Sequence, residues 1–253
     1  MDFQGKAIIV TGGASGIGRA ITAYLAEAGA IVAVFDLNQK TLHETCRWVV
    51  DRGHQCFGYG VDITDYRAVQ KAVSEFYRVS NSKVYGLVNN AGWDLATPFI
   101  DTTPEFWDQV ININLKGPLN VTHCCLPAMV ESGEGRVVSI ASDAGRVGSS
   151  GEAVYSAAKG GMVALMKTLA REHARHGITF NSICPGPTDT PLLAGLDPRG
   201  SGKLAAALEK AIPMRRLAQP SDFPALVAYF LSKEAAYVTG QTVSISGGLT
   251  MQG

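Results

Sequence analysis

Two residues with complementary acid–base properties stand four apart in the stretch YSAAK: Tyr155 and Lys159. An isolated tyrosine has a pKa of about 10, so a tyrosine that acts as a base near neutral pH needs a pKa lower by roughly 3, an energy of about 4 kcal/mol. On a helix, residues four apart share one face, which places the Lys159 ammonium beside the Tyr155 ring. One charge at about 4–5 Å contributes on the order of 3–4 kcal/mol at an effective dielectric near 20. The pair is therefore suited to proton transfer, although the same spacing also occurs in ordinary helices with an exposed lysine.

The N-terminal part of the chain gives an independent indication of a ligand site. A short apolar run at 6–10 has the character of a buried parallel strand and leads directly into the glycine-rich stretch 11–18. A helix pattern follows, and a second apolar run at 31–35 closes on Asp36. This order is typical of a dinucleotide site, in which glycines let the backbone approach a pyrophosphate at the helix N-terminus. Asp36 stands where an acid binds the ribose hydroxyls of adenosine.

Asp36 also favours one nicotinamide cofactor over the other. Its carboxylate repels the 2′-phosphate that distinguishes NADP from NAD, and neither Ser15 nor Leu37 supplies a cation that neutralises this phosphate. We therefore expect the chain to bind NAD. The contacts expected from this part of the chain are Gly12, Ser15, Gly16, Ile17, Gly18, Asp36 and Leu37.

Strand and helix patterns alternate along the chain without a linker or a low-complexity stretch. Strands are expected at 6–10, 31–35, 55–61, 84–89, 136–141, 178–184 and 242–246. Helices are expected at 17–28, 38–52, 65–78, 105–130, 153–175 and 221–231. This alternation predicts an α/β fold, a single doubly wound Rossmann-type domain spanning 1–253, with a seven-stranded parallel sheet and helices on both faces. The polar candidates follow strands, so they should meet at the carboxyl edge of the sheet, where such folds bind ligands.

Several motifs in this order resemble the short-chain dehydrogenase/reductase family. They are the spacing Gly12-x-x-x-Gly16-x-Gly18, Asn89-Asn-Ala-Gly92, Ser142 with Tyr155-x-x-x-Lys159, Pro185-Gly-Pro-Thr188, Val238-Thr-Gly-Gln241 and Gly247-Gly248. The resemblance therefore covers nearly the full length. One departure is Ser246, where family members often carry an acid before the final glycine pair. That acid is not catalytic in the family, so the departure concerns a contact at the end of a strand.

The resemblance implies reversible hydride transfer between a nicotinamide cofactor and a carbon bearing an alcohol or a ketone. Tyr155 would exchange the proton of the substrate oxygen, Lys159 would lower the pKa of Tyr155, and Ser142 would position the substrate oxygen. Asn114 matches the family residue that bends its helix and holds a water linked to the lysine, although a helix asparagine can also bond its own backbone. Asp62 either contacts adenine or caps a helix. The further implied cofactor contacts are Asp62, Ile63, Asn90, Ala91, Gly92, Tyr155, Lys159, Pro185, Gly186, Thr188 and Thr190.

The unusually polar segment 142–155 is expected beside the reacting carbon. With the stretches 89–94, 171–178, 184–190 and 247–253, it resembles members of the family that oxidise a ring secondary alcohol carried as a CoA thioester. The expected pocket residues are Trp93, Asp94, Ser142, Asp143, Arg146 and Glu152, under a lid around 188–215. The phosphates of CoA need cations, and solvated surface residues are the available candidates: Arg146, Arg199, Lys203, Arg215 and Arg216.

Three alternatives stay open at this stage. A 3-oxoacyl carrier-protein or acyl-CoA reductase uses the same four residues, but such reductases usually take NADPH, which Asp36 opposes. The polar segment also suits a smaller secondary alcohol or a sugar-like one. Finally, an NAD(H)-sensing protein without activity can use an inherited fold. All four functional residues are present, which argues against that alternative.

Composition argues against several other classes of protein. The 22 basic side chains balance 22 acidic ones, so no charge asymmetry indicates nucleic acid or a membrane surface. No apolar run approaches the roughly 18 residues of a membrane span, and no secretory pattern opens the chain, so a cytoplasmic protein is expected. The five cysteines have no metal-binding spacing, and we expect reduced thiols and no metal. The family resemblance suggests a homotetramer, built partly from the helices at 105–130 and 153–175.

Overall fold

The computed structural model describes residues 1–195 and 202–251. In this part of the chain, seven strands form one parallel sheet in the order β3-β2-β1-β4-β5-β6-β7. Their bounds are β1 Ala7–Thr11, β2 Ile31–Asp36, β3 Gln55–Gly60, β4 Val84–Asn89, β5 Gly135–Ile140, β6 Ile178–Pro185 and β7 Thr242–Ile245. The predicted fold class is confirmed, and each predicted strand lies within about two residues of an observed one. The strand order reverses between β1 and β4, which is where doubly wound sheets bind ligands.

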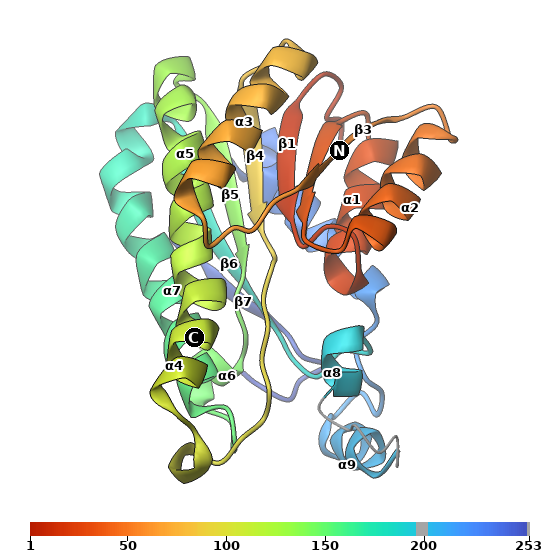
Figure 1. Ribbon diagram of the computed structural model, residues 1–253, viewed down its shortest axis with the longest axis vertical. Coiled ribbons are helices and arrows are strands. Elements are labelled where there is room, and N and C mark those ends of the chain that lie inside the picture. Colours follow the sequence, from red (N-terminus) through yellow and green to blue (C-terminus); the bar gives the residue numbers. More distant parts are fainter. Residues whose placement is uncertain (196–201, 252–253) are drawn as a thin grey trace.

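Helices cover both faces of the sheet (Figure 1). They are α1 Gly16–Glu27, α2 Gln39–Val50, α3 Tyr66–Ser80, α4 Pro104–Ile111, α5 Gly117–Ser132, α6 Ala144–Val147, α7 Ala153–His173, α8 Pro191–Gly195, α9 Lys203–Ala211 and α10 Pro224–Leu231. Short 3-10 turns occupy Phe99–Asp101, Ala174–His176, Pro220–Asp222 and Lys233–Ala235. In Figure 1, α8 lies beyond the end of the sheet, below α1, and α9 lies farther down at the lower end of the molecule.

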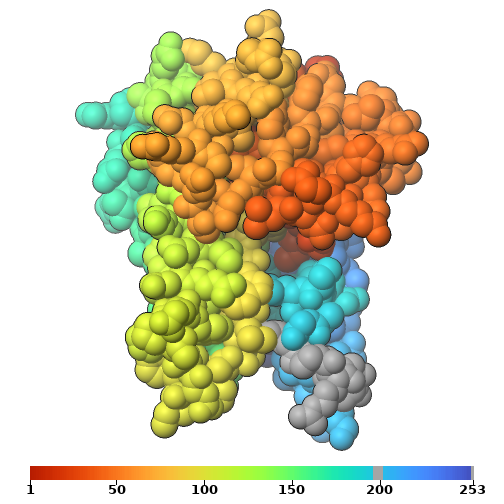
Figure 2. All heavy atoms as spheres, viewed as in Figure 1, coloured from red at the N-terminus to blue at the C-terminus, as the bar shows by residue number. Residues whose placement is uncertain are grey.

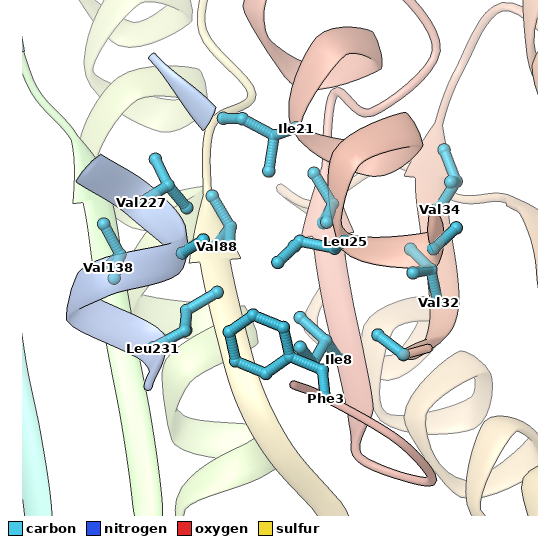
Figure 3. Packing of buried hydrophobic residues seen from close by; sticks show 14 of the residues in the cluster. Phe3, Ile8, Ile21, Leu25, Val32, Val34, Val88, Val138, Val227 and Leu231 are labelled. Carbon is cyan, nitrogen blue, oxygen red and sulfur yellow. The ribbon is translucent and has the colours of Figure 1, made fainter. Parts of the chain in front are cut away.

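Two hydrophobic clusters hold these layers together. Alternate strand residues point to opposite faces, so Ile8 and Val32 pack on α1, α2 and α10, while Ile9 and Ala33 pack on α3, α5 and α7. Figure 3 shows the first cluster, in which Ile21, Leu25, Val227 and Leu231 of the helices meet the strand valines around Phe3. Because both faces are covered, the central strands carry almost continuous apolar sequence.

The helix predicted at 105–130 is present as a continuous helical segment over 104–132. Within it, a π-helical turn, Asn112–Lys116, separates α4 from α5, and Asn114 in that turn is fully buried. The Asn114 side chain explains the division, because its amide donates to the Val110 carbonyl, four residues earlier, at 2.9 Å. Side chains that insert into the backbone ladder are a recognised cause of such bends. The predicted helix 221–231 also begins later, at Pro224, after a 3-10 turn.

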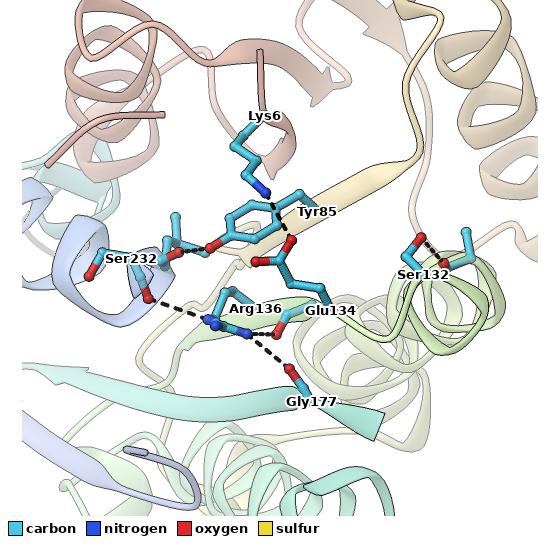
Figure 4. A network of polar contacts seen from close by, with 10 residues as sticks. Lys6, Tyr85, Ser132, Glu134, Arg136, Gly177 and Ser232 are labelled. Carbon is cyan, nitrogen blue, oxygen red and sulfur yellow. Dashed lines mark hydrogen bonds and ion pairs between the residues drawn. The ribbon is translucent and has the colours of Figure 1, made fainter. Parts of the chain in front are cut away.

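The amino ends of the strands are fastened by a polar network (Figure 4). Arg136 is buried, and its guanidinium donates to the carbonyls of Gly135, Gly177 and Ser232 at 2.8, 3.0 and 3.3 Å. The Tyr85 hydroxyl donates to the Leu231 carbonyl at 2.7 Å. These bonds join the central strands to α10 at the edge opposite the glycine turn. Among residues 1–195 and 202–251, no helix has the length and apolarity to cross a membrane.

Candidate active site

The glycine turn after β1 leaves no room for side chains. A Cβ at Gly18 would lie 2.1 Å from the Gly12 carbonyl oxygen, and one at Gly12 would lie 2.9 Å from the Ala91 Cα. Gly12 and Gly16 also have positive φ angles of 60° and 48°, which favour glycine. The Ser15 side chain makes no capping hydrogen bond within the described chain. The first N–H groups of α1 are therefore available to an anion, as a pyrophosphate site requires.

Asn90 and Thr11 join the ends of β1 and β4 at the point where the strand order reverses. The Asn90 side chain donates to the carbonyls of Thr11 and Gly12 at 3.0 and 3.1 Å. The Thr11 hydroxyl accepts from the N–H groups of Asn90 and Ala91, each at 3.0 Å. The sequence analysis gave Asn90 a cofactor contact, whereas its bonds here hold the glycine turn in shape.

Two acids lie along the adjoining edge of the sheet. Asp36 accepts hydrogen bonds from the N–H groups of Ala14 and Asn38 at 3.1 and 3.0 Å, so it is fixed beside the glycine turn and stays partly exposed. Asp65, rather than Asp62, caps α3 by accepting from two N–H groups in its first turn. Asp62 is exposed and bonds only locally, to the Thr64 N–H. The helix-cap explanation for Asp62 is therefore wrong.

Tyr155, Lys159 and Ser142 meet at the carboxyl end of β5. Tyr155 and Lys159 lie on the inner face of α7 with exposed fractions of 8% and 2%. Ser142 and Tyr155 line the same cavity, and Ser142 lowers the pKa of the Tyr155 phenol. The Lys159 ammonium donates to the Ile140 carbonyl at 2.9 Å and stands 5.5 Å from the centre of the Tyr155 ring. The four-residue spacing thus produces the contact expected of it, and the lysine is buried.

Burial shifts the pKa values of both Tyr155 and Lys159. Burial, followed by the charges of Glu152 and Asp94, raises the pKa of Tyr155 well above its ordinary value, while Ser142 lowers it. Burial also lowers the pKa of Lys159 to about 8. In the protein without cofactor, burial is the largest effect on Tyr155, and it favours the neutral phenol over the phenolate. That Lys159 lowers the pKa of Tyr155 in the complex with the cofactor stays a prediction.

Asn114 connects the helix division to this cluster. Its side-chain oxygen accepts from the Trp93 N–H at 3.2 Å, and its amide donates to the Trp93 carbonyl at 2.6 Å. A Cβ added to Gly92 would lie 2.9 Å from the Asn114 oxygen and 3.3 Å from the Lys159 nitrogen. Asn114 and Lys159 therefore both lie against Gly92, and a side chain at this position would displace one of them.

Ser142, Tyr155 and Lys159 line a cavity of about 740 Å³. Figure 2 shows a hollow between two lobes at the bottom of the view. The floor of the cavity contains the glycine turn, Asn90, Ser142, Tyr155 and Lys159. Part of its apolar wall comes from α8 and α9, within the segment predicted as a lid: Leu192, Leu193, Leu204 and Leu208. The rest was not predicted from the sequence, because it comes from separate parts of the chain: Ala96, Val147 and Leu249. The volume and the mixed lining suit a cofactor end and a small organic substrate.

The expected pocket residues take different positions. Glu152 and Asp143 line the cavity, whereas Trp93, Asp94 and Arg146 do not. Trp93 packs edge-on against Phe106, with ring centres 6.0 Å apart. Asp143 is hydrogen-bonded to Ser244 of β7, whose hydroxyl also accepts from Arg146 at 2.7 Å. These bonds attach the loop after Ser142 to the last strand.

The described cations considered for CoA, Arg146, Lys203, Arg215 and Arg216, are not among the residues that line the cavity. Among the described residues, Lys159 is the lysine or arginine that lines it. Arg216 forms two hydrogen bonds with Asp222, at 2.6 and 3.0 Å, and Arg215 bonds the Lys210 carbonyl. Arg199 lies outside the described residues. Ser246, the departure noted in the sequence, bonds the backbone of Thr250, which brings Leu249 and Thr250 to the cavity wall.

The doubly wound sheet, the glycine turn at its switch point and the tyrosine–lysine pair beside it define an oxidoreductase that binds a nicotinamide cofactor. A family model described as enoyl-(acyl carrier protein) reductase matches residues 12–250. The chain belongs to the short-chain dehydrogenase/reductase family, whose members act on hydroxyl and keto groups.

Named relatives span the full length of the chain. A 3-oxoacyl-(acyl-carrier-protein) reductase of Thermotoga maritima is 33% identical over 99% of this chain and 100% of its own. A human (3R)-3-hydroxyacyl-CoA dehydrogenase is 34% identical, covering 96% of this chain and 95% of the relative. Among solved structures, actinorhodin polyketide ketoreductase with NADPH has a TM-score of 0.93 at 34% identity, covering 98% of this chain and 99% of that one.

Proposed function

We propose that this protein catalyses the NAD-dependent oxidation of a secondary alcohol to a ketone, in a reversible reaction. The observation that carries the proposal is that Ser142, Tyr155 and the buried Lys159 line the floor of one cavity together with the glycine turn. A proton donor and acceptor, a positioning hydroxyl and a pyrophosphate cradle are thus within one enclosure.

The protein's own residues handle the proton and the orientation of the substrate. Tyr155 accepts the proton of the alcohol as a phenolate in the oxidation and returns it as a phenol in the reduction, and Ser142 holds the substrate oxygen beside it. Lys159 is charged below a pH of about 8 and stabilises the phenolate once it forms. The bound nicotinamide supplies the hydride chemistry. Asn114 holds the loop at Trp93 against Lys159, which keeps the ammonium in place.

The cofactor residues fit a dinucleotide. The glycine turn and the first N–H groups of α1 would hold the pyrophosphate, Asp36 the adenosine ribose, and Asp62 with Ile63 the adenine. Thr188 and Thr190, at the end of β6, would hold the nicotinamide end. We propose NAD, because the Asp36 carboxylate, which is held beside the glycine turn, would repel a 2′-phosphate. The NADPH in the solved ketoreductase belongs to that protein and leaves the choice here to experiment.

For the substrate, we propose 2-hydroxycyclohexanecarboxyl-CoA, oxidised to the 2-oxo thioester in the breakdown of alicyclic acids. The five sequence stretches given above support this choice, and the apolar cavity walls suit a ring. A relative that is named for a CoA thioester supports the thioester. Since Lys159 is the lining cation in the described chain, the CoA phosphates would lie outside the cavity. We also propose the homotetramer of the family, with α4, α5 and α7 at the interface.

One other activity has specific support. The relatives include a 3-oxoacyl-(acyl-carrier-protein) reductase and a (3R)-3-hydroxyacyl-CoA dehydrogenase, so a linear 3-hydroxyacyl thioester is the second candidate. Initial rates with NAD and NADP on the ring thioester, a linear 3-hydroxyacyl-CoA and free secondary alcohols test both. The highest kcat/KM on the ring thioester with NAD is expected. Preference for the linear thioester would replace the first proposal, and no turnover with any alcohol would contradict the enzyme itself.

A further inference from the structure

Two acidic side chains meet beside Tyr155. Asp94, on the loop after β4, is 7% exposed, and Glu152 immediately precedes α7. Both side chains line one small recess beside Tyr155. Two ionised carboxylates in one recess repel each other, so a single proton held between them would stabilise the pair.

The surroundings favour that shared proton. Burial, followed by the neighbouring Glu152, raises the pKa of Asp94 to about 7, against the Leu95 backbone bond and Lys159, which lower it. Asp94 Oδ2 is buried and has no hydrogen-bond partner among the described residues. A proton shared by the two carboxyl groups would reduce the cost of burying this unpaired oxygen. The Thr97 N–H donates to the Gly151 carbonyl at 2.8 Å, so the two loops that carry the acids are fastened together.

Glu152 is the member of the pair that lines the main cavity, where a substrate would contact it. It shares this cavity with Ser142 and Tyr155, while Asp94 stands behind it in a small recess that both acids and Tyr155 share. The positive group that faces the pair is Lys159, which is directed to the Ile140 carbonyl. A substituent on the carbon next to the reacting alcohol would therefore meet a negative or hydrogen-bonding surface.

We propose that Asp94 and Glu152 form a proton-sharing pair that determines specificity, accepting an uncharged acyl group beside the reacting alcohol and excluding a free carboxylate there. Glu152 contacts the substrate, and Asp94 is a positioning residue that acts through it. The substrate class is a secondary alcohol whose neighbouring carboxyl group is carried as a thioester, an ester or an amide. The inference rests on the proposed oxidoreductase function.

The test compares two probes that differ mainly in charge: 2-hydroxycyclohexanecarboxylate and its methyl ester, each with NAD. We expect kcat/KM for the ester to exceed that for the acid at least tenfold. Glu152→Gln should reduce this ratio at least tenfold by improving use of the acid, and Asp94→Asn should reduce it less. Glu75→Gln, on the exposed face of α3, removes the same charge away from the cavity and should leave the ratio unchanged. Equal use of both probes, or an equal loss for both in Glu152→Gln, would overturn the proposal.

A second measurement is independent of turnover. Carbon-13 NMR of labelled aspartate and glutamate carboxyls, on the folded protein without substrate, should show one carboxyl that titrates near neutral pH. That titration should be absent in Asp94→Asn. If every carboxyl titrates in the ordinary acidic range, the shared proton does not exist. Calorimetric affinities of both probes for the protein–NADH complex complete the test. Weaker binding of the acid would support the pair even if neither probe reacts, an outcome that contradicts only the proposed function.

Discussion

The Lys159 ammonium lies 5.5 Å from the centre of the Tyr155 ring and donates its hydrogen bond to the Ile140 carbonyl, not to the phenol. The lysine therefore acts on the tyrosine through its charge alone. Because burial lowers the pKa of Lys159 to about 8, that charge is complete below this pH and is lost above it.

Tyr155 should remain a phenol across neutral pH in the protein alone. Burial raises its pKa, so absorbance titration should show no phenolate from Tyr155 below about pH 10, as judged by difference from Tyr155→Phe. This substitution should lower kcat by roughly 10²- to 10⁴-fold, the usual contribution of a general acid or base. NADH affinity should stay within about threefold. A variant that keeps its turnover would show that another group transfers the proton.

Replacing Lys159 by methionine should have opposite effects on activity and stability. The loss of the charge should lower kcat/KM, while the free energy of unfolding should rise at pH 7, where burying the charged lysine is costly. The sign follows from the depressed pKa: stability associated with Lys159 is present above its unfolded value and is lost as pH falls through about 8. Thermal unfolding at pH 7 and pH 10 checks this, and a larger gain at pH 10 would contradict it.

The cofactor preference should depend on the charge of Asp36. Asp36→Asn keeps an acceptor for the Ala14 N–H and removes the repulsion of a 2′-phosphate. We expect the ratio of kcat/KM for NAD to that for NADP to fall by about tenfold or more, since one charge pair at short range is worth about 1–3 kcal/mol. Asp51→Asn, at the far end of α2, serves as the control. Equal ratios in both variants would remove Asp36 from the account of specificity.

A methyl group at Gly18 should disrupt the turn. Its Cβ would lie 2.1 Å from the Gly12 carbonyl oxygen, so Gly18→Ala should lower the free energy of unfolding by about 1–3 kcal/mol and weaken NADH binding at least tenfold. Gly195→Ala is the matched control, because within the described chain no atom lies within 4 Å of its added Cβ. Denaturant unfolding and fluorescence titration with NADH measure both effects. Normal affinity in Gly18→Ala would mean that the cradle is not the cofactor site.

The raised pKa of Asp94 should make the free energy of unfolding depend on pH. Asp94 has a pKa raised to about 7, so the folded protein binds a proton that the unfolded chain releases between about pH 4 and pH 7. Its contribution to stability is complete below the unfolded value and is lost as pH rises to about 7. The difference in unfolding free energy between Asp94→Asn and the unchanged protein should therefore favour the variant more at pH 8 than at pH 5. A difference that is constant with pH would contradict this.

The strands and the position of the site followed from local patterns. Apolar runs gave the strands, and polar residues directly after them gave the edge at which ligands bind. The π-helical turn at Asn114 was indicated only by the family resemblance, which assigns a helix bend to this residue, because a helical pattern does not reveal the side-chain bonds to Trp93 and Val110. The raised pKa of Tyr155 was missed, since it arises from the burial of the ring beside Asp94 and Glu152.

Contacts between distant segments were the least predictable. The cysteines at 46 and 56 have no spacing that suggests a pair, yet α2 and β3 bring the Cys46 and Cys56 sulfurs within 3.2 Å. Likewise, Ser246 was noted only as a departure from the family, whereas its hydroxyl holds the backbone of Thr250 near the cavity. Both contacts depend on tertiary packing.

The two ends of the segment proposed as a lid are joined to each other. Thr188 pairs with Ala218 in an isolated parallel bridge, in which the Asp189 N–H donates to the Ala218 carbonyl and the Ala218 N–H donates to the Pro187 carbonyl, at 2.9 and 3.0 Å. Segments of different lengths can join such ends, because the entropy of closing a loop grows only slowly with its length. Relatives could therefore carry different segments between these two strand-like ends, and so different substrate ranges, on an unchanged sheet.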